Sequence, residues 1–467
     1  MERLTGLDAG FLYMETPTLY MHTLKIGLID PSTSPAGYSF ERFHDEMAKR
    51  LHLLPAFRRR VIEVPGGFHH PVWIEDPDFD LDRHIHREVI PAPGGFREMD
   101  AMVAEIASRR LDRRRPLWEM WAIEGLEGGL VAFVTKIHHS IADGVAAAAM
   151  LANVMTQDPE AIEPVASPRP WSPEAVPPRG RLLRDAFLDH LRQLARLARL
   201  IRRTVRALVA VTRHRRTIEV SPPLPFAAPQ TRFNQSLSPL RSFATTSMTL
   251  ADFLTVKSAF AVTVNDVVLA ACAGSLRRYL DRRGELPERS LVAGVPVSTA
   301  SPDEALRLTG NRLSNIFTSL ATDIADPVQR LRAIHDVTRE AKGLHTLLGA
   351  DMLQEWVEYT PPRPYAAAVR LYSHLRISDR VRPPLNVVVS NVPGPSRPLY
   401  VAGARLMNVF SVGPVLEGIG LNLTAWSYLG QMNLAAIACR RALPNLYEIT
   451  DGVREAMEEL VQAARRR

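Results

Sequence analysis

Two periodicities of hydrophobic and polar residues run along this chain, and together they predict both strands and helices. Runs rich in β-branched and aromatic residues predict a β-hairpin over residues 117–124 and 130–137, strands over 290–297 and 385–390, and a second hairpin over 423–440. Apolar, alanine-rich segments predict helices over residues 145–155 and 262–279. Since both halves contain both kinds of element, we predict an α+β fold, an α/β sandwich in each half.

A proline-rich segment divides the chain. Eleven of the 36 prolines fall between residues 159 and 229, and proline interrupts helices and sheets. The chain has 467 residues, whereas single hydrophobic cores stop growing at roughly 250–300 residues. We therefore predict an N-terminal half over residues 1–158, a linker over 159–230 and a C-terminal half over 231–467.

The linker contains a predicted basic amphipathic helix. Its apolar residues recur at alternating spacings of four and three and form a stripe: Leu183, Phe187, Leu191, Leu194, Ala198, Ile201, Val205 and Leu208. Arginines repeat every seven residues on another face: Arg192, Arg199, Arg206 and Arg213. Such a helix can lie in a membrane interface with its arginines on anionic headgroups. Alternatively, the stripe can pack onto one of the domains as a tether, and the sequence leaves both interpretations open.

The positive charge of the chain is concentrated in this helix. Of the formal net charge of +7, residues 179–216 carry +10, from twelve arginines and two aspartates, and the remaining chain carries −3. Outside the helix, no basic face is interleaved with the aromatic residues that single-stranded nucleic acid requires, and no nucleic-acid motif is recognisable. We therefore expect a lipid partner and no nucleic acid.

The cysteines and the opening residues indicate a location. Cys272 and Cys439 lie far apart in apolar stretches, which predicts neither a disulfide framework nor a thiolate metal site and suits a reducing cytoplasm. An acid follows Met1 directly, and no secretory signal is evident. No stretch approaches the roughly 18–20 apolar residues of a spanning helix. We expect a cytoplasmic protein that is soluble or bound at a membrane surface.

The segment HHSIADG, residues 138–144, carries the predicted chemistry. It follows the second strand of the first hairpin and precedes the alanine-rich helix. Imidazole has a pKa suited to accepting a hydroxyl proton near neutral pH, which acyl transfer to an alcohol requires. Asp143 can brace the loop through an ion pair or backbone hydrogen bonds, and Gly144 permits a sharp turn into the helix.

Two adjacent histidines can also have a structural role or bind a metal. A purely structural pair is the commoner case for two adjacent histidines taken in isolation, and we expect His69 and His70, a second such pair, to lie in an exposed loop. A metal site is disfavoured because the usual two-histidine spacing on a helix or strand is absent, so we predict no metal. No G-x-S-x-G elbow, P-loop or G-x-G-x-x-G motif is present. Histidine-based transfer remains.

The same seven residues match the HHxxxDG motif of the superfamily that includes chloramphenicol acetyltransferase, carnitine acyltransferases and the condensation domains of peptide synthetases. Five further segments resemble the bacterial wax ester synthase/diacylglycerol acyltransferase family, especially the actinobacterial triacylglycerol synthases. In the order of the family they are LDAGFL from residue 7, LD at 111 with RPLWE from 115, VNDV from 264, VPVS from 295 and SNVPGP from 390. The resemblance extends from Leu4 to about Glu459.

The resemblance implies two chloramphenicol-acetyltransferase-like halves with an active-site tunnel between them, reached by acyl-CoA from one side and the alcohol from the other. It makes His139 the general base, with His138 as its supporting neighbour. Asp143 would have a structural role and pair with an arginine, for which Arg312 and Arg278 are the candidates.

The resemblance also brings candidates for substrate contact, namely Gly144, Trp118, Asn265 and Ser298. Hairpin packing is at least as good an interpretation of Pro116, Leu117 and Trp118 as substrate contact, and helix capping is at least as good an interpretation of Asn265 and Asp266. Ser298 and Asn265 are also candidates for the donor that stabilises the oxyanion. Ala300 departs from the family, which often has an arginine after this stretch; if that arginine contacts the phosphates of CoA in relatives, the affinity for CoA is affected here.

We therefore expect an acyl-CoA-dependent O-acyltransferase that transfers the acyl group directly, without a covalent acyl-enzyme. Diacylglycerol is the favoured acceptor and a long-chain alcohol, giving a wax ester, the second. Acyl-CoA is a co-substrate, no cofactor is expected, and the protein would lie at the inner membrane or at lipid droplets. The alternatives are a polyketide-associated or condensation-type enzyme with a carrier-bound acyl donor, and a lipid-surface protein without activity.

Overall fold

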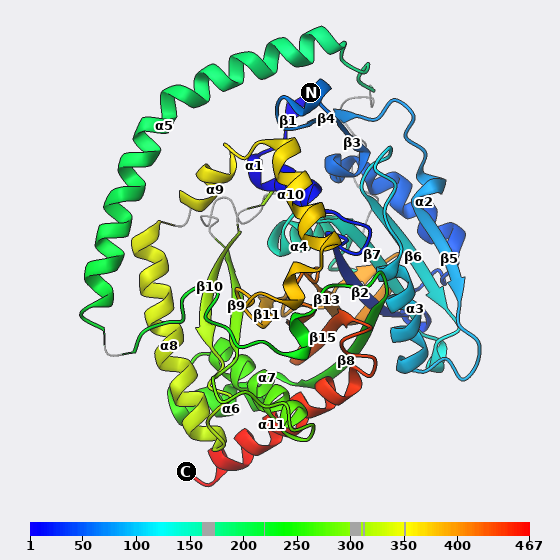
Figure 1. Cartoon of the computed structure of the whole chain (residues 1–467). Helices are drawn as coiled ribbons and strands as arrows, with labels where there is room; N and C mark the ends of the chain where they lie inside the picture. Colours follow the sequence, from blue (N-terminus) through cyan, green and yellow to red (C-terminus); the bar gives the residue numbers. More distant parts are fainter. Residues whose placement is uncertain (161–172, 219, 299–309, 312, 350–351) are drawn as a thin grey trace.

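The computed structural model (Figure 1) describes residues 1–160, 173–218, 220–298, 310–311, 313–349 and 352–467. Within these residues the strands form two six-stranded mixed sheets and one three-stranded sheet. Helices cover the faces of the large sheets, which confirms the predicted α/β sandwich in each half. The small sheet contains β1 (Glu2–Arg3), β4 (Val72–Glu75) and β3 (Arg59–Ile62).

The sheet of the N-terminal half has helices on both faces. Its strands, in spatial order, are β12 (Tyr400–Val401), β13 (Ala404–Val412), β2 (His22–Asp30), β7 (Val131–His138), β6 (Trp118–Glu124) and β5 (Ile85–Val89). Because successive side chains of a strand point to opposite faces, Val134 packs with α3 (Phe96–Ser108), while Phe133 packs with α2 (Phe40–Arg50). The predicted hairpin is confirmed, since β6 and β7 pair antiparallel.

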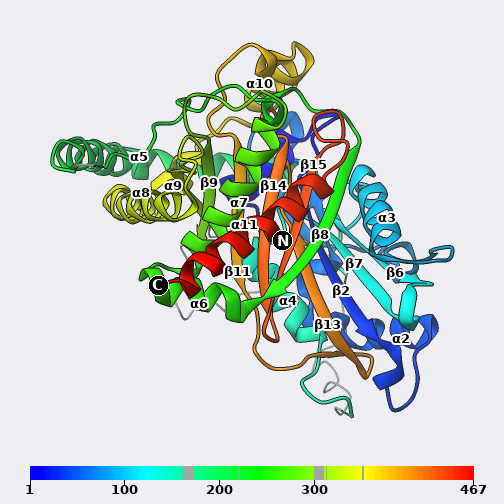
Figure 2. The same ribbon diagram turned by 90° about the horizontal axis from the view of Figure 1, so that it is seen from below.

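The sheet of the C-terminal half buries one helix almost completely. Its strands, in spatial order, are β10 (Leu313–Ser319), β9 (Val292–Ser298), β11 (Val387–Pro393), β14 (Leu421–Tyr428), β15 (Gln431–Cys439) and β8 (Arg241–Thr249). The buried helix α7 (Val264–Asp281) crosses its face beside α11 (Tyr447–Arg465), as Figure 2 shows. The remaining covering helices are α6 (Leu250–Phe260) and α8 (Pro327–Leu348). The predicted strands and second hairpin of this half are confirmed.

One segment of the C-terminal half belongs to the other sheet. After β11 the chain crosses over, and β13 pairs antiparallel with β2 through seven residue pairs that include Phe410 and Ile26. The chain then returns to the C-terminal sheet with β14. A boundary drawn between residues 1–158 and 231–467 therefore does not separate the two sheets, because residues 400–412 lie with the first range.

The predicted linker helix is α5 (Arg179–Arg215), which curves around the outside of the molecule (Figure 1). The residues that it buries are Leu182, Ala186, Leu200 and Ala207. Its leucine-rich stripe faces outward, with Leu191 50% and Leu194 64% exposed. The tethering interpretation of the stripe is thus wrong for this structure, because a separate face of α5 makes the contacts with the body.

Two further helices, α9 (Met352–Val357) and α10 (Pro362–His374), lie near α1 (Gly6–Met14) between the sheets and α5 (Figure 1). No single helix among the described residues is long and apolar enough to cross a membrane. Only α6 and α7 together pass a test of length and composition, and they meet at a bend of 104°.

Trp118 allows a prediction about stability. Its side chain is 0% exposed and stacks on Phe57 and His84, and its indole Nε1 donates a hydrogen bond of 2.8 Å to the carbonyl oxygen of Phe57. In Trp118→Phe this buried carbonyl loses its donor, which costs about 1–3 kcal/mol. Chemical unfolding should show a loss of that size, while KM for the substrates stays unchanged. A raised KM with normal stability would instead favour substrate contact.

Candidate active site

The HHSIADG segment forms the loop that joins β7 to α4 (Gly144–Val154). β7 is the fourth strand of its sheet and is buried over its whole length, so the loop starts from a rigid element. His138 is the last residue of β7 and Gly144 the first of α4. The sequence prediction of a strand-to-helix loop is confirmed at these positions.

Neighbouring groups hold His139 in place. Its side chain is 9% exposed, and its ring lies 4.3 Å from the ring of Phe11 between centroids, at a tilt of 32°. Its backbone N–H donates to the carbonyl oxygen of Met21 at 2.7 Å. Burial lowers the pKa of His139 to about 4, because the charged imidazolium loses its hydration, and the nearby carboxylate of Asp143 acts in the opposite direction.

The C-terminal half supplies the partner of this imidazole. Nδ1 of His139 lies 2.9 Å from Oδ1 of Asn311, and Nδ2 of Asn311 donates to the carbonyl oxygen of His139 at 2.7 Å. Gly310, the residue before, donates its N–H to the carbonyl oxygen of Ile141 at 2.8 Å. The HHSIADG loop is therefore fastened to a segment 172 residues further along the chain.

Nδ2 of Asn311 also donates to Oδ1 of Asp8 at 2.6 Å. Asp8 belongs to α1, and its other carboxylate oxygen accepts a hydrogen bond from the hydroxyl of Thr5 at 2.8 Å. Burial raises the pKa of Asp8 to about 7, although the hydrogen bonds from Asn311 and Thr5 lower it. Asp8, Asn311 and His139 thus form one buried chain of hydrogen bonds across the two halves.

His138 faces another set of groups. Its Nδ1 accepts a hydrogen bond from the backbone N–H of Ser140 at 3.1 Å, and its Nε2 lies 3.4 Å from Oε1 of Glu15. The side chain is 0% exposed. The two histidines therefore have different partners. His138 contacts Ser140 and Glu15, whereas His139 contacts Asn311.

Asp143 begins the helix that follows. Its carboxylate accepts a hydrogen bond from the backbone N–H of Ala146 at 2.9 Å, and its carbonyl oxygen accepts one from Ala147 at 2.8 Å, the arrangement of a helix cap. Two arginines were candidates to pair with Asp143. The prediction of Arg278 is wrong, because that side chain lies on α7 and binds Glu459 at 2.6 Å. Arg312 lies outside the described residues.

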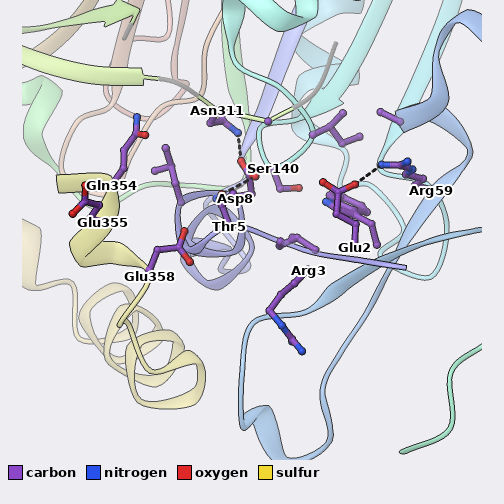
Figure 3. Close-up of a pocket in the computed structure, with 16 residues that line it drawn as sticks. Glu2, Arg3, Thr5, Asp8, Arg59, Ser140, Asn311, Gln354, Glu355 and Glu358 are labelled. Atoms are coloured by element: carbon purple, nitrogen blue, oxygen red, sulfur yellow. Dashed lines mark hydrogen bonds and ion pairs between the residues drawn. The ribbon is translucent and has the colours of Figure 1, made fainter. Parts of the chain in front are cut away.

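A cavity of about 510 Å³ opens beside the loop. Its lining comes from the N-terminal segment, the small sheet, the HHSIADG loop, Gly310–Asn311 and α9, and the close-up in Figure 3 shows Asp8, Ser140 and Asn311 together on one wall. The residues that line it include Ser140, Ile141, Asn311, Asp8 and Glu358. The imidazole of His139 is not part of the described lining, whereas the next two residues, Ser140 and Ile141, and its partner Asn311 are.

The cavity is acidic. Glu2, Asp8, Glu355 and Glu358 line it, against Arg3 and Arg59. Both arginines are already paired, Arg3 with Asp189 of α5 at 2.8 Å and Arg59 with Glu2 at 2.8 Å. Burial raises the pKa of Glu358 above its usual value, against a hydrogen bond from the backbone of Gly6. The walls therefore favour a neutral ligand over a polyanionic one.

Trp118 and Asn265 are not among the described residues that line this cavity. Trp118 lies in the core, as described above, and Asn265 is the second residue of α7, half-buried. The helix-capping interpretation of Asn265 and Asp266 is confirmed at Asp266, which forms the capping box of α7 with Thr263. Ser298 ends β9, opposite Leu313 of β10, and Ala300 lies outside the described residues.

The second histidine pair is not in an exposed loop, and that prediction is wrong. His69 and His70 are 3% and 1% exposed. Nδ1 of His70 lies 2.9 Å from the hydroxyl of Tyr13, and His69 stacks on His190 of α5 at 4.4 Å between centroids. Contacts from α1 and from a helix more than a hundred residues away bury this pair.

Sequence reasoning missed Asn311 as a site residue. It also gave no role to Asp8, although the opening LDAGFL segment was among the motifs. No local pattern marks Asn311, because its partners lie at positions 8 and 139 and only the folded chain brings them together.

The comparisons with known proteins cover almost the whole chain. The wax ester synthase/diacylglycerol acyltransferase catalytic domain matches residues 4–268, and the C-terminal domain of the same family matches residues 309–461. A protein of Mycobacterium tuberculosis, provisionally named a diacylglycerol O-acyltransferase, is 41% identical over 472 residues, covering 100% of this chain and 98% of that protein. A second from the same organism, with the same provisional name, is 39% identical over 464 residues, at 99% and 97%.

Solved structures show the same similarity. The wax ester synthase/diacylglycerol acyltransferase of Marinobacter aquaeolei VT8 is 31% identical, with a TM-score of 0.69 over 99% of both chains. The first condensation domain of the calcium-dependent antibiotic synthetase superposes with a TM-score of 0.62 at 13% identity, covering 99% of this chain and 96% of that one. The second similarity concerns the fold alone.

Proposed function

Because the chain belongs to the wax ester synthase/diacylglycerol acyltransferase family and is an acyltransferase, we propose that it transfers a fatty acyl chain from acyl-CoA to diacylglycerol, with His139 as general base. Long-chain alcohols are second acceptors, and the products are a triacylglycerol or a wax ester. Acyl-CoA is the co-substrate, and the transfer is direct.

One observation carries this proposal. The loop with His139 lies where the two halves meet, and a cavity of about 510 Å³, large enough for part of a lipid, opens at the same place. A group that must contact two substrates from opposite sides has to lie at such a junction, because neither half alone can surround both. Contact between the ring and a bound acceptor then requires a side-chain movement at the cavity wall, a common change on binding.

In the proposed reaction, Nε2 of His139 removes the proton of the acceptor hydroxyl while its oxygen attacks the thioester carbonyl carbon. The C–O bond forms and the C–S bond breaks. The thiolate of CoA then takes the proton from the imidazolium, which returns His139 to its neutral state. The carboxylate of Asp143, whose charge favours the protonated imidazole, stabilises this intermediate state.

We assign the acidic cavity to the acceptor alcohol. Diacylglycerol and fatty alcohols are neutral, whereas CoA carries several phosphate charges. Both arginines of the described lining are already paired with carboxylates, Arg3 with Asp189 and Arg59 with Glu2, so neither is left to bind these phosphates. Arg3, which lines the cavity, binds Asp189 of α5, so the cavity and α5 lie next to each other. A lipid acceptor can then pass into the cavity from a lipid surface bound by the outward face of α5.

An assay with a panel of acceptors tests the proposed function. Purified protein is incubated with labelled palmitoyl-CoA and diacylglycerol, monoacylglycerol, hexadecanol or a carrier protein loaded with an acyl group. Ester formation with diacylglycerol at the highest kcat/KM supports the proposal. Turnover only from the carrier-bound acyl group supports the condensation-type alternative, and binding of lipid without any turnover supports the inactive lipid-surface protein.

We also propose that α5 places the enzyme on an anionic lipid surface, such as the inner membrane or a lipid droplet. Its outward face carries half-exposed apolar side chains, among them Phe187, Leu194 and Val205 at 55%, 64% and 55%. The arginines repeating every seven residues are exposed beside them. An apolar stripe next to cations suits the boundary between acyl chains and anionic headgroups.

The pH profile follows from the burial of His139. The base acts when neutral, and its pKa of about 4 means that it is neutral above about pH 5, whereas an ordinary histidine titrates near 6.5. We expect protonation of His139 to lower kcat/KM only below about pH 5. The measurement is kcat/KM across pH 4–9, with the folding of the protein checked at each pH. Asp8→Asn is the control for titration of Asp8. An acid limb near 6.5 in both proteins would contradict this prediction.

A further inference from the structure

We propose that Asn311 is a positioning residue that holds the proton of His139 on Nδ1 and thereby leaves Nε2 free to act as the base. The inference rests on the proposed function of His139. It assigns the C-terminal half a direct part in the reaction, through a side chain that sequence motifs do not mark. It also gives Asp8, in the opening segment of the chain, the role of orienting Asn311.

The surroundings of the amide decide its orientation. Nδ2 of Asn311 has two acceptors within reach, Oδ1 of Asp8 at 2.6 Å and the carbonyl oxygen of His139 at 2.7 Å. Turning the amide by 180° would place its oxygen against the carbonyl oxygen of His139, which has no hydrogen to donate. The orientation with Oδ1 toward the imidazole is therefore the one that satisfies all partners.

The orientation of the amide fixes the tautomer. Oδ1 of Asn311 can only accept a hydrogen bond, so Nδ1 of His139, 2.9 Å away, must carry the proton. A hydrogen bond of the imidazole with the backbone of His139 itself acts beside that of Asn311. In neutral imidazole the other nitrogen then has the free lone pair. None of the described residues makes a hydrogen bond to Nε2 of His139. This nitrogen is therefore left for the substrate hydroxyl.

The chain of bonds is rigid because it is buried. Asn311 is 6% and Asp8 4% exposed. The backbone beside Asn311 is also fixed, since the N–H of Gly310 donates to the carbonyl oxygen of Ile141 and its carbonyl oxygen accepts from the N–H of Asp143. Groups locked by neighbouring hydrogen bonds keep a catalytic side chain in the productive orientation, in this case from both halves.

The first test compares two asparagines. Asn311→Leu keeps the approximate shape but accepts no hydrogen bond, so both tautomers of His139 become populated. We expect kcat to fall about 30- to 100-fold, with KM for palmitoyl-CoA within twofold of the wild type. The matched control is Asn315→Leu, on an exposed position of β10, where kcat should stay within twofold.

The second test exchanges the two groups. Asn311→Asp alone places a carboxylate against Asp8 and should lower kcat at least as much as Asn311→Leu. Adding Asp8→Asn restores an amide and a carboxylate facing each other. The carboxylate at position 311 still lies against the carbonyl oxygen of His139 to which Asn311 donates, so we expect a partial recovery of about threefold. The carboxylate then contacts Nδ1–H directly, so the acid limb of the pH profile should move upward, which a merely structural role of position 311 would not produce.

The tautomer itself can be measured. Nitrogen NMR of protein labelled in histidine, with His139→Gln to assign the signal, should show Nε2 unprotonated in the wild type and a mixture in Asn311→Leu. Full activity of Asn311→Leu with an inactive His139→Gln overturns this inference and leaves the proposed function intact. An active His139→Gln overturns the proposed function, and the NMR signal then decides the role of Asn311 alone. If Asn311→Leu does not fold, the double variant Asp8→Asn/Asn311→Asp is the test. A kcat no higher than that of Asn311→Asp alone then overturns the inference.

Discussion

Replacing His139 with glutamine is expected to lower kcat for triacylglycerol formation by about 10²- to 10⁴-fold, the usual contribution of a general base. Glutamine fills much of the same space and keeps a polar group near Asn311, so the loop should stay folded. It has no basic nitrogen, so the acceptor hydroxyl keeps its proton and attacks poorly. The measurement is ester formation from labelled palmitoyl-CoA and diacylglycerol at saturating concentrations of both.

The matched control for this variant is His374→Gln, at the exposed C-terminal end of α10. It should keep activity within twofold of the wild type. Thermal unfolding should show that both variants are folded, since His374 is far from the core and His139 is replaced by a side chain of similar length. Near-normal activity of folded His139→Gln would refute the mechanism, whatever the acceptor.

The second large effect concerns the lipid surface. Four outward apolar side chains of α5, Phe187, Leu191, Leu194 and Ile201, are 55%, 50%, 64% and 45% exposed. Completing the burial of a side chain that is already half covered contributes about 1 kcal/mol. Replacing all four with glutamine should therefore weaken binding to vesicles by about 10³-fold. Co-sedimentation with vesicles that contain anionic lipid measures this directly.

Two controls separate lipid binding from folding. The quadruple variant should unfold at the same temperature as the wild type, because these half-exposed side chains belong to neither of the buried apolar clusters that α5 joins, whereas Leu200→Gln, on the buried face of α5 at 3% exposure, should destabilise the protein. Binding of the wild type should also weaken as salt is raised, since the arginines act through screened charges. Unchanged vesicle binding by the quadruple variant would mean that another surface contacts lipid.

Much of the fold could be predicted because it follows from local patterns. The runs of β-branched and aromatic residues in 117–124 and 130–137, separated by a short loop, predict a hairpin, and the three-and-four spacing along α5 predicts a helix. The HHSIADG segment was placed on a strand-to-helix loop for the same reason. Each of these patterns depends only on the geometry of neighbouring residues.

The crossover of β13 could not be predicted in this way. A strand carries the same alternation whichever sheet it joins, and pairing with β2, rather than with the strands of its own half, depends on contacts nearly 400 residues apart in the sequence. The direction of the stripe on α5 has the same explanation. Periodicity identifies the apolar face of a helix, but it does not tell whether that face meets the protein or its surroundings.

The sequence by itself thus determined the α/β elements, the family and the histidine that carries the proposed chemistry, since these are written in short segments of adjacent residues. Only the tertiary structure decided which groups surround that histidine. Asp8 and Asn311 reach His139 from positions 131 and 172 residues away, and Arg278 is drawn instead to Glu459. Hydrogen bonds act over about 3 Å, so a partner is chosen by position in space, which the order of residues along the chain does not reveal.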